Sequence, residues 1–179
     1  MNYYYFAATL PMLSLDTPPP LSLDQFRARC SEFLAPADSA ALADVLDPAR
    51  PTDAAFVKAW RARDAELRNA IARHRATRRR VDPAPHLRET PDYDLRIEKA
   101  VFDALIKPTP IERELALDRL RWELADELAG HNAFSERAIL AYGLKLQMVE
   151  RWAAADSAEV LQSFQHIVAS AERGVAEVH

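Results

Sequence analysis

The sequence predicts an all-α fold, and three observations support that prediction. The 179 residues include only three glycines, so few positions suit the tight turns on which β-hairpins depend. Alanine, leucine, glutamate and arginine, all strong helix formers, dominate the rest. Twelve prolines fall between segments whose apolar residues recur three, four and seven positions apart. We therefore expect a single domain over residues 1–179, a compact bundle of six to seven helices with short proline-marked connections.

The first element is an aromatic and proline-rich segment over residues 1–20. It begins with four consecutive aromatic residues, Tyr3, Tyr4, Tyr5 and Phe6. The apolar run over 3–10 fits either a strand or the first turns of a helix, because periodicity does not separate the two over so short a run. An apolar segment of this kind must be buried in the protein's own core or against a partner, and both uses stay open for the tyrosines.

Two short helices and one long helix are expected next. A helix over 23–34 begins with a capping box at Ser22. A second helix, over 36–46, has a proline in its first turn, where no backbone N–H is required. A long basic helix follows over 52–80, capped by Thr52.

Helices also fill the C-terminal half of the chain, over 92–176. Thr109 and Pro110 predict the start of one helix, and Gly130 predicts its end, since glycine readily adopts the conformation that follows a helix. The sequence D-S-A-E from Asp156 is a capping box, which predicts that a further helix starts there. The helices expected in this half are therefore 92–106, 110–129, 134–155 and 156–174.

The charge is distributed unevenly along the chain. Residues 58–80 hold nine basic and two acidic side chains, a charge of +7, so the remainder carries −11 to give the net −4. The cations gather at the end of the long helix, at Arg73, Arg75, Arg78, Arg79 and Arg80. One interpretation is a solvated helix end whose cations complement the helix dipole. The others are a surface for an acidic partner or for the acidic remainder of this chain, a nucleic-acid site, and a contact with anionic lipid head groups.

The residue patterns of common catalytic and metal sites do not occur. Three scattered glycines build neither of the glycine-rich nucleotide-binding loops, and no G-x-S-x-G is present. The five histidines include no pair four residues apart and have no cysteine pair beside them, so no metal site is predicted. Cys30, the single cysteine, suits a small core position and a reducing cytosol. We therefore expect a protein that is not an enzyme and that uses no cofactor or metal.

No segment predicts secretion or membrane insertion. No basic residue precedes the first apolar run, as a signal peptide requires. That run ends by Asp16, which is too short for the roughly 20 residues of a membrane-spanning helix. This pattern predicts a cytoplasmic protein.

Three blocks of the sequence resemble a small, uncharacterised bacterial family. They are the opening MNYYYFAATLPML with LSLDQF after it, ELRNAIARHRA over 66–76, and the longer stretch over 117–152. That family is encoded among the genes of bacterial V-type ATPases and is similar to a shortened form of their C-type stalk-socket protein, whose eukaryotic counterpart is the d-type protein. The C-type protein also begins with a tyrosine-rich segment. After Tyr142 the present sequence differs from the C-type pattern. Other motifs of the C-type protein are matched by Glu66, Arg68 and Asn69, and by Phe134, Ala141 and Tyr142.

The resemblance implies a non-catalytic accessory or central-stalk socket subunit that acts by docking to other V-type ATPase subunits, at the rotor ring or the central stalk. Ion transport then belongs to the whole complex, and the protein is cytoplasmic, peripheral to the inner membrane through the ATPase and in only indirect contact with the membrane. The alternative is a free-standing helical adaptor or nucleic-acid-binding module that uses Arg73–Arg80. Large rings and arginines are favoured interface anchors, although core packing is the alternative for the rings. The expected partner contacts are Tyr3, Tyr4, Tyr5, Trp60, Arg73, Arg75, Arg78, Arg79 and Arg80.

Overall fold

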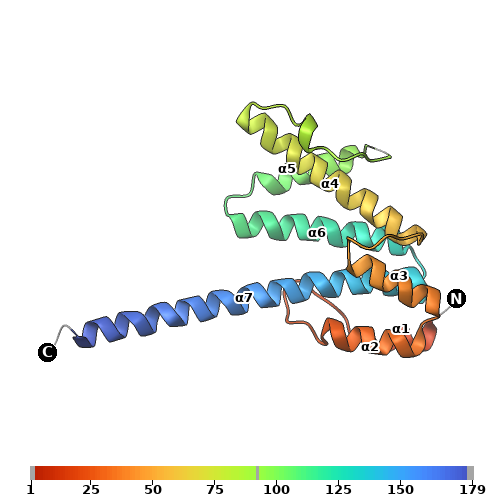
Figure 1. Ribbon diagram of the computed structural model, residues 1–179, viewed down its shortest axis with the longest axis horizontal. Coiled ribbons are helices and arrows are strands. Elements are labelled where there is room, and N and C mark those ends of the chain that lie inside the picture. Colours follow the sequence, from red (N-terminus) through yellow and green to blue (C-terminus); the bar gives the residue numbers. More distant parts are fainter. Residues whose placement is uncertain (1–2, 92, 177–179) are drawn as a thin grey trace.

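The computed structural model describes the backbone of residues 3–91 and 93–176, and the side chains of these residues as far as Asp156. Over this part of the chain the fold is all-α, as predicted, with seven α-helices, one short 3₁₀-helix and no strand (Figure 1). The helices are α1 (Tyr4–Ala8), α2 (Leu23–Phe33), α3 (Pro36–Leu46), α4 (Ala55–Arg79), η1 (Ala84–His86), α5 (Leu95–Leu105), α6 (Pro110–Ala129) and α7 (Glu136–Ala176).

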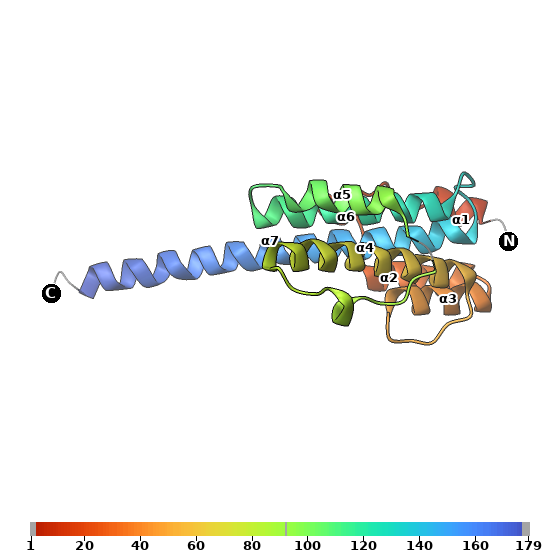
Figure 2. The same ribbon diagram turned by 90° about the horizontal axis from the view of Figure 1, so that it is seen from above.

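The helices pack on two sides of α7 (Figures 1 and 2). α6 runs antiparallel beside α7, and α4 and α5 pack on α6 and on each other. α2 contacts α7 from the other side, and α3 contacts both α7 and α4. One hydrophobic core cluster joins these layers and includes Phe26 of α2, Val57 of α4 and Leu140 of α7. α4 crosses the bundle obliquely, so its C-terminal end lies well away from α7 in Figure 1.

α7 is one continuous helix, where we predicted two. The expected helix start at Asp156 is wrong, because the chain passes through this residue in helical conformation. Neither glycine nor proline occurs near it, and the preceding run of three alanines strongly favours propagation of the helix. The C-terminal part of α7 runs beyond the other helices in both views (Figures 1 and 2).

The aromatic N-terminal segment forms a short helix that closes against the bundle. The backbone N–H of Tyr3 donates to the carbonyl oxygen of Phe134 at 2.7 Å, just before α7. The Tyr3 hydroxyl donates to Asp38 and accepts the backbone N–H of Ala35 at 3.0 Å, at the start of α3. Phe6 is buried and stacks on rings of α2. Within residues 3–10, Tyr4–Ala8 are thus helical, and the side chains of Tyr3 and Phe6 belong to the core.

Three of the sequence signals for helix ends are confirmed, and a second one besides Asp156 is wrong. The capping boxes at Ser22 and Thr109 both form, and Gly130 ends α6 with a φ of 72°. Thr52 does not cap α4, which begins three residues later with Ala54 at the N-cap position. The Thr52 hydroxyl instead accepts the backbone N–H of Ala54 at 3.2 Å, a local turn that competes with a capping role.

Gly143 allows α7 to approach α2 and α3 closely. A Cβ atom at this position would lie 2.9 Å from Cδ1 of Leu42 and 3.2 Å from Cε1 of Phe26. Such separations are shorter than van der Waals contact, so a larger side chain here would require Leu42 and Phe26 to shift. This close approach fixes the N-terminal helices against the part of α7 that also supports α6.

Candidate functional site

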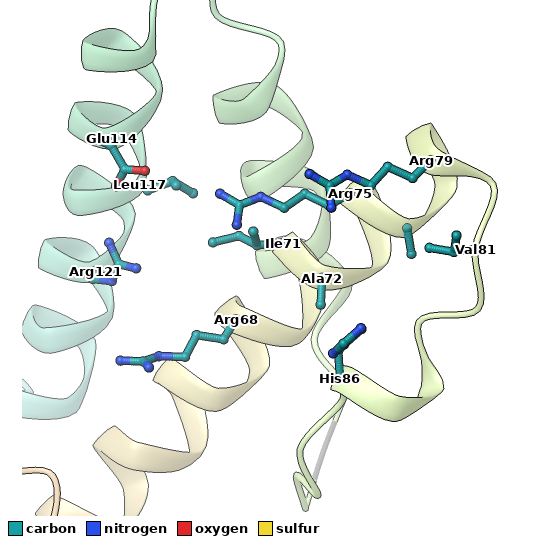
Figure 3. Close-up of a pocket in the computed structure, with 11 residues that line it drawn as sticks. Arg68, Ile71, Ala72, Arg75, Arg79, Val81, His86, Glu114, Leu117 and Arg121 are labelled. Atoms are coloured by element: carbon teal, nitrogen blue, oxygen red, sulfur yellow. The ribbon is translucent and has the colours of Figure 1, made fainter.

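The arginines of α4 separate onto different faces of the helix. Arg68, Arg75 and Arg79 are spaced seven and four residues apart, which places them on one face. Figure 3 shows all three extending toward α6. Arg73 lies off this face and contacts Glu98 of α5 instead. The cluster that looked continuous in the sequence therefore serves two sides of α4.

A groove with a volume of about 480 Å³ lies between α4, α6 and η1 (Figure 3). We call it the basic groove. Its base is apolar, formed by Ile71 and Ala72 of α4 and by Leu117 of α6. Val81 and His86 close it on the side of η1. The charged residues that line it are Arg68, Arg75, Arg79, Glu114 and Arg121.

Two of the groove arginines already have carboxylate partners. Arg68 Nε donates to Asp64 Oδ2 at 2.7 Å. Arg121 Nη1 donates to the buried Asp118 at 2.7 Å, and its Nε lies 3.5 Å from Asp64. These contacts make a continuous ionic chain from α4 to α6. They hold the lower part of the groove together.

Arg75 and Arg79 have no such partner. Within the described part of the chain, no carboxylate lies within ion-pair distance of either guanidinium. Both side chains are exposed, and Figure 3 shows them side by side over the apolar base. Glu114 is the single acidic residue among those lining the groove. The upper part of the groove therefore presents uncompensated positive charge.

Arg73 belongs to a structural network on the opposite side of α4. Its guanidinium donates to Glu98 and, at 3.0 Å, to the buried Glu66. Its Cζ also lies 5.2 Å from the ring centroid of Tyr93. The hydrogen bonds to Glu98 raise the pKa of Arg73. Nε and Nη2 of Arg73 are thus engaged within the protein, so this arginine differs from the others predicted as partner contacts.

Arg78 and Arg80 complete the cationic end of α4. Both are exposed and lack carboxylate partners among the residues described. Arg80 is the C-cap residue and has a φ of 57°, which is the left-handed conformation. Glycine usually takes this place, because other residues adopt it at a cost of roughly 1–2 kcal/mol. Arginine is thus present at a position that favours glycine.

Asn69 fixes the loop that carries His86. Its side-chain amide donates to the carbonyl oxygen of Arg88 at 2.8 Å, and its Oδ1 accepts the backbone N–H of Arg88 at 2.8 Å. Glu66 supports the same loop by accepting the Thr90 hydroxyl at 3.1 Å. Sequence reasoning missed this role. The signal was the block around 66–69, where a buried Glu and Asn share one face of the helix.

The aromatic candidates do not line the basic groove: the tyrosines lie in the N-terminal segment, and Trp60 lies on α4 before Arg68. Tyr3 and Trp60 are buried in the core, so neither presents its ring to a partner as we expected. Tyr4 and Tyr5 are exposed, and the Tyr4 ring packs 4.6 Å from that of Phe134. Figure 1 places α1 near the start of α7 and the end of α4 at the far side of the bundle. The structure therefore does not unite the two groups of predicted contacts.

The described side chains offer little acid–base or metal chemistry. No group of three His, Cys, Asp or Glu residues among them is arranged to hold a metal ion. Cys30 is buried, and desolvation raises the pKa of its thiol to about 12, which disfavours the reactive thiolate. What the arrangement provides is a fixed, positively charged concave surface with an apolar base.

None of the helices, over the residues described, combines the length and the hydropathy needed to cross a bilayer.

Comparison with known proteins identifies the family of this chain. No curated protein and no solved structure matches it. A family model described as "Protein of unknown function (DUF2764)" matches residues 36–175, which include the whole of α4, α5 and α6. The chain therefore belongs to the DUF2764 family.

Proposed function

We propose that the protein is a non-catalytic docking subunit whose basic groove, together with the end of α4, binds an acidic surface of another protein. The observation that carries this proposal is the pair Arg75 and Arg79, which lie over an apolar base without a carboxylate partner among the described residues. An acidic partner would supply the missing ion pairs. Electrostatic complementarity of this kind raises the association rate and fixes the register of docking.

Two further features support this proposal. Asn69 and Glu66 hold the loop beside the groove from within the core, so the concave surface is formed before any partner arrives. A preformed surface loses less conformational entropy on binding. Arg80 adds charge at a backbone position that favours glycine, and such strained positions are frequent at functional sites.

We further propose that the partner belongs to a bacterial V-type ATPase, either at the rotor ring or at the central stalk. The support is the resemblance of the three sequence blocks to proteins encoded with that ATPase. One of those blocks, 66–76, contains Glu66 and Asn69 as well as Arg75. In this role the protein would act through contacts alone and would leave ATP hydrolysis to other subunits.

Co-purification from native membranes tests both the basic groove as the docking surface and the ATPase as the partner. The tagged full-length chain should bring down ATPase subunits, and the double charge reversal Arg75→Glu/Arg79→Glu should reduce their yield by about tenfold or more. The matched control is Arg29→Glu/Arg137→Glu, which changes the net charge equally at two exposed arginines outside the groove. Absence of ATPase subunits from the wild-type sample would refute the ATPase assignment. Equal yields from both variants would refute the groove as the docking surface.

Nucleic acid is the competing ligand for the same cations. The exposed arginines at 75, 78, 79 and 80 favour it, because phosphate contacts are made by clustered arginine and lysine. Binding of this kind would appear as a mobility shift with duplex DNA or RNA that weakens steeply as salt increases. If Arg75→Glu/Arg79→Glu abolished such a shift and left ATPase co-purification intact, nucleic acid would replace the acidic protein as the ligand of the basic groove.

A further inference from the structure

α5 carries a row of large apolar side chains on its outer face. Leu95, Phe102 and Ile106 are 70%, 52% and 60% exposed. Their spacing of seven and four residues places them within about 20° of one line along the helix, at 100° per residue. We call this row the α5 stripe. Single exposed apolar residues are ordinary, but three along one face mark a binding surface.

The α5 stripe borders a second groove, which lies between α5 and α4. This α4–α5 groove has a volume of about 420 Å³. Leu95 and Phe102 form its wall on α5, and His74, Thr77 and Arg78 form its wall on α4. The Phe102 ring meets the His74 ring edge-on with 5.6 Å between their centroids. This contact holds the aromatic wall in place before any ligand binds.

The charge around the α4–α5 groove is positive. Lys99 and Arg78 line it and have no carboxylate partner in the described part of the chain. Glu98, the single acidic residue in the lining, is already bound to Arg73. Asp103 lies about 80° around α5 from the stripe and does not line the groove. The groove thus combines an apolar wall with an unneutralised cationic rim.

We propose that the α4–α5 groove binds one amphipathic helix of an acidic partner protein. The partner's apolar face would cover the α5 stripe, and its carboxylates would meet Lys99 and Arg78. The stripe runs from Leu95 at the start of α5 to Ile106 at its C-cap, eleven steps or roughly 16 Å at 1.5 Å per residue, which matches about three turns of a docked helix. Recognition of this type uses apolar anchors at helical spacing together with charges at the edge. The proposal deepens the docking function above and rests on it for the acidic nature of the partner.

A synthetic peptide tests this inference without the natural partner. The probe is an 18-residue fluorescent helix with leucine on one face and glutamate on the other, and its binding to the full-length protein is followed by anisotropy. Phe102→Ser/Ile106→Ser should weaken binding by about tenfold or more, because both anchors are removed. The matched control is Ile111→Ser, which removes an exposed apolar side chain of similar accessibility (59%) from α6. All three positions are exposed, so these variants should fold.

Three outcomes would overturn the inference. Equal binding of a peptide with lysine in place of glutamate would show that the cationic rim does not select an acidic helix. Unchanged binding by Phe102→Ser/Ile106→Ser would show that the stripe is not the contact. A concentration-dependent dimer that Phe102→Ser/Ile106→Ser abolishes would show that a second copy of this chain covers the stripe instead.

Co-purification separates this inference from the proposed function. If Phe102→Ser/Ile106→Ser retained the full yield of ATPase subunits, the α4–α5 groove would not be part of the docking surface, while the docking function itself would stand. If the wild-type chain bound the acidic peptide and brought down no ATPase subunit, the groove would be supported and the ATPase assignment would fall.

Discussion

Arginines occur along much of α4, but those in its middle and those at its end have different surroundings. In the middle, Arg68 and Arg73 each reach a carboxylate on α4, and Arg73 also joins α4 to α5 through Glu98. At the end, Arg75 and Arg79 extend over an apolar base without a carboxylate among the described residues. One residue type in one helix thus serves two purposes. The first group forms ion pairs within the protein, and the second is the one that we propose binds another molecule.

Burial explains why the two groups should respond differently to substitution. Removing one partner of a buried ion pair leaves an uncompensated charge, which destabilises the fold strongly. Exposed arginines without partners contribute little to stability, since water already solvates them. Substitutions in the pairs whose carboxylate is buried, those of Glu66 and Asp118, should therefore change the free energy of unfolding. Substitutions among the unpaired arginines should change binding and leave stability nearly constant.

The largest effect on stability is expected for Asp118→Ala. Asp118 is fully buried and accepts hydrogen bonds from Arg121, Arg151 and Trp152, so its loss would leave donors of α6 and α7 without their acceptor. The free energy of unfolding should fall by about 3 kcal/mol, as expected when a buried pair loses one member. Chemical denaturation measures this change. Asp103→Ala, at an exposed carboxylate of α5, should stay within about 0.5 kcal/mol of wild type.

The next effect is expected for Asn69→Ala. This change removes both hydrogen bonds to the backbone of Arg88 and leaves that N–H and C=O without their partner. The free energy of unfolding should fall by about 2 kcal/mol. Hydrogen exchange at the Arg88 amide should accelerate at the same time, because the loop beside the basic groove is released. Full protection of that amide in the variant would show that the loop is held by other contacts.

A smaller effect, of opposite sign, is expected for Arg80→Gly. Glycine relieves the left-handed conformation but increases the entropy of the unfolded chain, so the protein should gain about 0.5 kcal/mol in stability. Binding of the acidic partner should weaken, because one cation of the unpaired group is lost. The matched control is Arg78→Gly, which lies inside α4 and should instead lose about 1 kcal/mol. A loss of stability in both variants would contradict the assigned strain at Arg80.

Local patterns predicted most helix boundaries, because the groups that form them are close in sequence. Ser22 and Thr109 each interact with a residue three positions later, and Gly130 acts through its own backbone. The same local reading was wrong at Thr52 and Asp156. In both cases the sequence contained a capping signal, but the backbone around it did not begin a helix there. A capping pattern shows that a residue could cap a helix. It does not show that a helix begins immediately after that residue.

Which arginines have carboxylate partners could not be predicted from the sequence, because several of these partners are distant along the chain. Glu98 is 25 positions from Arg73, and Arg121 lies on a different helix from its partner Asp64, so the pairing depends on how α4, α5 and α6 pack. Helical spacing alone places Arg75 and Arg79 on one face but does not reveal which neighbour that face meets. Trp60 illustrates the same limit, since the sequence left both a partner contact and core packing open for its ring, and the structure buries it in the core.

The smallest effect is expected at the exposed ion pair that joins α5 to α6. The hydrogen bonds from Arg96 hold the pKa of Glu127 below its ordinary value of 4.5. A lowered carboxyl pKa adds stability that is fully present above the ordinary value and is lost as the pH falls through the lowered one. Arg96→Ala should therefore raise the pKa of Glu127 and weaken the dependence of unfolding on pH below about 4.5, which NMR titration and acid denaturation would measure.

Asp94 supplies an internal control for that experiment. Its pKa is lowered chiefly by the backbone N–H of Arg96, with the Arg96 side chain as a lesser cause, and the backbone N–H remains after the substitution. The pKa of Asp94 should thus stay low in Arg96→Ala while that of Glu127 rises. If the pKa values of both carboxyls rose together, the N-cap of α5 would depend on the Arg96 guanidinium. Arg96 would then resemble the arginines of α4 that form ion pairs within the protein. If only Glu127 shifted, the Arg96–Glu127 pair would act as an isolated exposed ion pair. Its contribution to the free energy of unfolding should then be far below that of Asp118, whose arginine partners meet it in a buried site.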